Sequence, residues 1–125
     1  MMPKYRFPQN YILIMGFISF EEEAIEQINN INAEMRAIRV LMGKNGDVAN
    51  VYIREQSLPH ISNIDKYVKK YLRAKEELEK SNGINLFLYG RNVDVWNGEN
   101  VPVIVWEEYF MNTFKRLAYS INNCY

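Results

Sequence analysis

The side chains that most often perform catalysis are scarce in this sequence. His60 is its only histidine and Cys124 its only cysteine, so a metal site or a nucleophilic pair built on imidazole and thiol has one group of each kind to use. His60 follows Pro59 in an expected loop, and Cys124 is the penultimate residue, with no base nearby to activate it. We therefore predict no catalytic residue, no metal site and no cofactor. Replacing both residues is expected to leave folding and binding unchanged.

The acidic residues do not suggest a reactive site either. They gather at 21–23, 76–79 and 107–108, all in segments that we expect to be helical, where solvation or the helix dipole accounts for them. The aspartates have no spacing typical of a magnesium or calcium loop. The sequence also contains no Walker loop, no Gly-x-Ser-x-Gly and no Cys-x-x-Cys motif. An enzyme is the least favoured class of function.

A glycine loop with a basic residue is one candidate for a nucleic-acid-binding element. The segment GKNG, residues 43–46, resembles the Gly-x-x-Gly loop of the KH family of nucleic-acid-binding domains, which clamps the backbone of the ligand. The resemblance implies that Lys44 would contact a phosphate. The same glycines suit the end of a helix followed by a turn, which needs no ligand, and we favour this interpretation.

A basic helix face is a second candidate for nucleic-acid binding. Lys66, Lys69, Lys70 and Arg73 share one side of an expected helix and, with Lys44, define the alternative function, a nucleic-acid-binding module. A solvated face with internal ion pairs explains the same pattern. The chain has 15 basic and 15 acidic residues, so no long-range field draws it to nucleic acid or to anionic lipid.

The chain that must position these side chains has the composition of a packed globule. It has 125 residues, of which 48% are hydrophobic and 14% aromatic, so we predict a single domain spanning 1–125. The apolar run 11–18 predicts a strand buried on both faces, because it is shorter than the roughly 20 residues of a membrane-spanning helix. We expect no membrane association.

A long amphipathic helix follows this expected strand. Its apolar residues recur at intervals of four, three, four, three and four and fall on one side of the helix, which Gly43 is placed to end. These residues are Ala24, Ile28, Ile31, Met35, Ile38 and Met42. In an alternative interpretation, residues 36–42 form a strand that pairs with 48–54, giving a ferredoxin-like β-α-β-β-α-β order with a C-terminal extension.

The rest of the chain predicts both helices and strands. Residues 48–54 favour a strand, a second helix begins at Ser62 or Asn63 and ends at Asn82, and three short strand-like runs within 84–106 suggest a β-meander. A third helix over 107–122 closes the fold. The predicted class is therefore α+β.

Two features favour a non-enzymatic binding or assembly protein. The apolar seam of the long helix and the aromatic-rich C-terminal third are typical of protein interfaces as well as of cores. We therefore expect a homodimer with an unknown protein partner, and a small ligand is a further option. The candidate interface residues are Ile28, Met35, Ile38, Met42, Trp106 and Tyr109.

The cellular setting can be inferred only from indirect features. A single cysteine cannot form an internal disulfide, and the first residues do not have the pattern of a secretory signal, so we expect a cytoplasmic protein. Isoleucine and asparagine are abundant. Their abundance favours an AT-rich coding source such as a low-GC bacterium, its phages or another mobile element.

Overall fold

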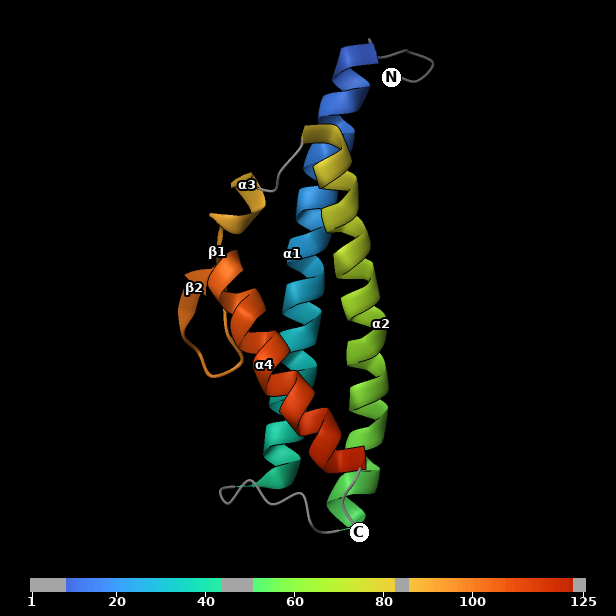
Figure 1. The fold of residues 1–125 in the computed structure, drawn as a ribbon, viewed down its shortest axis with the longest axis vertical. Helices are drawn as coiled ribbons and strands as arrows, with labels where there is room; N and C mark the ends of the chain where they lie inside the picture. The colour runs from blue at the N-terminus through green and yellow to red at the C-terminus, as the bar shows by residue number, and fades with distance from the viewer. Residues whose placement is uncertain (1–8, 44–50, 83–85, 123–125) are drawn as a thin grey trace, which may run out of the picture.

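Helices dominate the described part of the chain. The computed structural model describes residues 9–43, 51–82 and 86–122. In chain order the elements are α1 (Gln9–Met42), α2 (Val51–Asn82), α3 (Leu86–Tyr89), β1 (Asn92–Asp94), β2 (Asn100–Pro102) and α4 (Val103–Asn122). The helices α1 and α2 run antiparallel and side by side, and α4 lies obliquely against this pair (Figure 1).

One face of α1 forms the centre of the core. Its four-three spacing returns to the same side of the helix, so Ala24, Ile28, Ile31, Met35 and Ile38 are buried there. Gly43 has a φ of 71°, and its N–H donates to the carbonyl oxygen of Arg39 at 3.0 Å, which ends the helix. The predicted helical seam and its end at Gly43 are confirmed. Gly46 lies outside the described residues.

The helix α2 covers this face of α1. Ile64, Tyr71, Ala74 and Leu78 are its buried apolar side chains. The helix continues through Pro59, which has no N–H to donate to the carbonyl of residue 55. Because Pro59 is exposed, water can replace the missing bond, and the helix is not interrupted.

A small antiparallel hairpin leads into α4. Val93 pairs with Val101 across β1 and β2, and Gly98 adopts a φ of 97° in the connecting turn. The N–H of Val103 donates to the carbonyl oxygen of Arg91 at 2.8 Å, which fixes the first turn of α4 to the hairpin. One hydrophobic cluster joins residues of all three long helices with Val93, Val95 and Trp96.

The predicted α+β class is wrong. The expected buried strand at 11–18 lies within α1, and the part of the expected strand 48–54 that is described, Val51 to Arg54, lies in α2. The expected meander over 84–106 is replaced, where described, by α3, one hairpin and the start of α4. The ferredoxin-like alternative is also wrong, because residues 36–42 are the end of α1.

The predicted strands are helical because strand propensity depends on the neighbouring segments that a chain can pair with. Apolar and β-branched runs favour strands where a sheet offers partners on both sides, but α1 and α2 instead pack against each other, and tertiary packing overrides local propensity. Helical periodicity correctly located the later part of α1, the later part of α2 and most of α4. Among the described helices, none combines the length and apolar character needed to cross a bilayer.

Candidate functional site

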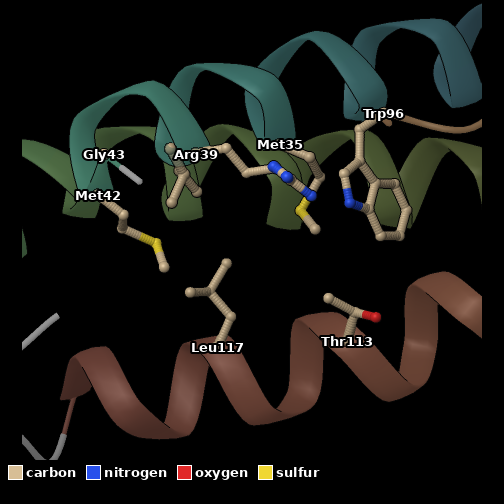
Figure 2. A pocket seen from close by; sticks show the side chains of 8 residues that line it. Met35, Arg39, Met42, Gly43, Trp96, Thr113 and Leu117 are labelled. Carbon is tan, nitrogen blue, oxygen red and sulfur yellow. The ribbon is translucent and has the colours of Figure 1, made fainter. Parts of the chain in front are cut away.

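A cavity of about 320 Å³ lies between the C-terminal part of α1 and the middle of α4. This volume is at the lower end of the range of small-molecule sites, about 300–1,000 Å³. The cavity is lined by Met35, Ile38, Arg39, Met42, Gly43, Trp96, Thr113 and Leu117 (Figure 2). It is the strongest candidate binding site among the described residues, because its walls are mainly apolar and its polar groups are few and distinct.

Two helices supply the facing walls of this cavity. On α1, residues 35, 38, 39 and 42 are spaced so that they share one side of the helix, and on α4 Thr113 and Leu117 are one turn apart. Figure 2 shows the side chains of Met42 and Leu117 pointing toward each other across the space. The two methionines on α1 are flexible and polarisable, so this wall can adapt to the shape of an apolar occupant.

Trp96 forms the end wall of the cavity. Its side chain is 6% exposed, and its ring centroid lies 5.1 Å from that of Tyr109 and 6.3 Å from that of Phe110. Contacts with two rings of α4 fix the indole in one position. The aromatic wall therefore has more packing partners than the methionine side chains, of which Met35 lies beside Trp96 in Figure 2.

A buried asparagine holds this arrangement together. Asn32, on α1, is 1% exposed, and its Nδ2 donates to the carbonyl oxygen of Asp94 at the end of β1. Its Oδ1 accepts a hydrogen bond of 2.9 Å from Nε1 of Trp106 on α4. One amide thus joins α1, the hairpin and α4, the three segments that contribute residues to the cavity.

Arg39 is the only charged residue among those that line the cavity. Figure 2 shows its side chain extending from α1 toward the side of the cavity formed by Met35 and Trp96. No ion pair joins it to another described residue. A guanidinium beside apolar walls can bind a carboxylate, sulfonate or phosphate attached to an apolar group. Thr113 adds a hydroxyl that can donate or accept a hydrogen bond.

A second polar cluster joins α2 to α4 away from the cavity. Glu107 accepts hydrogen bonds from the Tyr71 hydroxyl at 2.7 Å and from Nζ of Lys75 at 3.0 and 2.9 Å. The Lys75 ammonium also lies 5.2 Å from the centroid of the Tyr89 ring. This cluster includes a cation, a carboxylate and a phenol, but each is engaged with the others, and its role is to attach α4 to α2.

The electrostatics of this cluster shift two pKa values. Burial raises the pKa of the Tyr71 hydroxyl far above its ordinary range, and the charge and hydrogen bond of Glu107 add to the effect. For Lys75, burial lowers the pKa, but hydrogen bonds to Glu107 and Tyr89 outweigh it, and the net shift is upward. Both groups therefore keep their protons in the folded protein.

Further polar contacts connect distant segments. Arg91 bridges Glu21 and Glu22 of α1 through Nη1 at 3.2 and 3.0 Å. Nδ1 of His60 lies 2.6 Å from Oε1 of Glu34. The expectation that His60 lies in a loop is wrong: it lies in α2 and joins it to α1, because the helix continues through Pro59. Whether it is dispensable stays a prediction.

The candidate interface residues lie in two different environments. Four of them are 0–2% exposed within the single chain: Ile28, Met35, Ile38 and Trp106. A second chain therefore could not contact these side chains directly. Met42 is half-buried and lines the cavity, and Tyr109 is 41% exposed. Sequence periodicity identified the apolar face but could not say that α2 and α4 of the same chain cover most of it.

The structure describes four of the five basic residues that define the alternative function. Lys66, Lys69, Lys70 and Arg73 are exposed on one side of α2, as the helical spacing predicted. Lys44 lies outside the described residues. On the same helix, Nζ of Lys80 lies 3.7 Å from Oε2 of Glu77.

Some cavity residues were not identified from the sequence. Arg39, Thr113 and Leu117 belong to no sequence motif, and Trp96 lies in the aromatic-rich C-terminal third without a motif of its own. These residues lie far apart along the chain, and only the packing of α4 on α1 brings them together. The described residues contain no group of three or more histidine, cysteine, aspartate or glutamate side chains able to hold a metal ion. Cys124 lies outside them.

No protein-family model, no curated protein and no solved structure matches the chain.

Proposed function

We propose that the protein is a non-enzymatic binding protein that acts as a homodimer, and that the cavity between α1 and α4 is its binding site. The occupant is an apolar group that carries a negative charge. The observation that supports this proposal is the position of Arg39, a cation without an ion-pair partner in the described structure, on the edge of an otherwise mainly apolar cavity. Ligand sites commonly combine apolar walls with a few polar groups that orient the ligand.

The same chemistry can come from a small molecule or from a protein. A medium-chain carboxylate offers an apolar tail and one anionic head, and an amphipathic peptide offers leucine next to glutamate. Decanoate and a leucine-glutamate helical peptide are suitable probes of the two sources. Tighter binding of decanoate would favour a small ligand, and tighter binding of the peptide would favour a protein partner.

The test compares decanoate with decanol, which has the same chain length but no charge. We expect decanoate to bind about tenfold more tightly, because a charge-assisted hydrogen bond is worth roughly 1.5–3 kcal/mol and exposure of the guanidinium reduces this value. Arg39→Met should remove the difference and leave decanol binding unchanged. Arg36→Met is the matched control, because Arg36 is exposed on the same helix but does not line the cavity.

This test has a clear negative result. If neither decanoate below its critical micelle concentration nor decanol below its solubility limit binds, the cavity is not a site for this chemistry. If both bind equally well to the wild type and to Arg39→Met, the cavity accepts apolar groups but Arg39 does not select for charge.

A nucleic-acid-binding function is the second candidate, supported by four exposed basic side chains on one side of α2. Contacts with phosphates would make the affinity fall steeply with salt, and Lys69→Glu with Lys70→Glu would weaken binding to every sequence alike. We expect no binding near physiological ionic strength. A salt-sensitive gel shift of DNA or RNA under those conditions would reverse the ranking of the two functions.

A further inference from the structure

The outward face of α4 displays a regular stripe of exposed side chains. Ile104 is 53% exposed, Met111 37% and Tyr119 70%, and Glu108 and Lys115 between them are also exposed. Their spacing of four, three, four and four residues places all five within about 80° of one another around the helix axis. Three large apolar side chains and two opposite charges therefore share one side of α4, facing away from the core.

The order of these residues is self-complementary. Counted from the midpoint between Met111 and Asn112, Glu108 and Lys115 are equally distant, and so are Ile104 and Tyr119. A two-fold axis through that midpoint would bring Glu108 of one copy opposite Lys115 of the other, twice. It would also bring Ile104 against Tyr119 twice, with Met111 beside its own copy at the axis. An isologous contact requires this kind of symmetry.

The charges on this stripe are available for a second copy. No ion pair joins Glu108 or Lys115 to another residue in the described ranges. In a parallel arrangement of two α4 helices, like charges would face each other, and in the antiparallel arrangement opposite charges do. Such pairs mainly set the orientation of partners, and apolar burial supplies most of the affinity.

An apolar groove next to the stripe extends the available surface. It has a volume of about 460 Å³ and lies where α4 meets α2. Its lining residues include Val68, Phe110, Phe114 and Ala118, together with Met111 and Lys115 of the stripe. A second copy placed on the stripe would therefore also contact apolar surface beyond α4.

We infer that a second copy of this chain binds here, and that the homodimer forms by antiparallel, two-fold symmetric contact between the outward faces of α4. This inference rests on the homodimer of the proposed function and adds its surface and its geometry. It does not depend on what occupies the cavity between α1 and α4, which lies on the opposite side of α4.

Charge reversal tests the geometry by analytical ultracentrifugation of the full chain. Glu108→Lys and Lys115→Glu should each weaken the dimer by about tenfold or more in Kd, because each places two like-charged pairs at the interface. An equimolar mixture of the two variants should form a heterodimer about as tight as the wild type, since a doubly basic face then meets a doubly acidic one. The combined Glu108→Lys, Lys115→Glu chain should also dimerise.

The mixture separates a lost contact from a lost fold, because a misfolded variant would not be rescued by mixing. Lys66→Glu on α2 is the matched control and should leave the dimer unchanged. A dimer that neither reversal affects, or a mixture that stays monomeric, would overturn the proposed surface while the homodimer remains. A wild type that is monomeric up to millimolar concentration would overturn both, and decanoate binding by the same samples would report separately on the cavity.

Discussion

Trp106 donates a hydrogen bond from Nε1 to Oδ1 of Asn32 at 2.9 Å, and both side chains are buried. The same asparagine donates to the carbonyl oxygen of Asp94, so a single amide connects α1, the hairpin and α4. A buried polar group is tolerated only when its hydrogen bonds are made, and removing one partner leaves the others unsatisfied. The position of α4, and with it both proposed surfaces, depends on this amide.

We predict that Asn32→Leu lowers the free energy of unfolding by about 2–4 kcal/mol, because it leaves the indole N–H and the Asp94 carbonyl without partners. Trp106→Phe, which removes one donor and part of the ring, should cost a similar amount. The double variant should cost less than the sum, because the second change removes the group that the first left unpaired. Urea unfolding measures all three, and strictly additive costs would contradict the proposed coupling.

The stability of the protein should decrease at alkaline pH through the cluster around Glu107. The pKa of Tyr71 and that of Lys75 are both raised from ordinary values of 10.0 and 10.5. Above these values the unfolded chain releases protons that the folded chain keeps, so the free energy of unfolding falls as the pH rises. The expected slope is up to about 1.4 kcal/mol per pH unit for each proton retained.

Variants separate the two contributions to this slope. Tyr71→Phe and Lys75→Met should each make it less steep, although each also costs stability at neutral pH. Lys69→Met removes an exposed lysine of the same helix and should leave the slope as in the wild type. Urea unfolding between pH 8 and 11 measures the effect, and a wild-type stability that does not change over this range would contradict it.

Pro59 lies inside α2 and is exposed. Pro59→Ala should raise the free energy of unfolding by about 1–3 kcal/mol, because alanine restores the missing helical hydrogen bond and removes the clash of the proline ring. Gln56→Ala, an exposed neighbour, should change it by less than about 0.5 kcal/mol. Thermal unfolding followed by circular dichroism compares them. A loss of stability in Pro59→Ala would indicate that the ring packs favourably where it stands.

The sequence predicted best where one helical face meets the core. The spacing of Ile28, Ile31 and Met35 identified α1, and Gly43 identified its end, because both signals are local. It failed over 11–18, where an apolar run fits a strand or a helix equally well, and around Pro59, where the sequence predicts a loop. In both places the outcome depends on packing between α1 and α2, which no local pattern records.

The candidate site was predicted only in part for the same reason. Met35, Ile38 and Met42 were correctly grouped on one side of a helix, but they were assigned to an interface between chains. The packing of α4 on α1 adds Thr113 and Leu117 to them. Neither of these residues belongs to a motif, and a cavity exists only where segments far apart in sequence meet.

Methionine methyl resonances test the proposed binding site most directly. Met35 and Met42 line the cavity, whereas Met111 lies on the outward face of α4. In a titration of methyl-labelled protein with decanoate, we predict that the signals of Met35 and Met42 shift together and saturate, and that the Met111 signal does not follow them. Shifts confined to Met111, or none at any of the three below micelle formation, would contradict binding in this cavity.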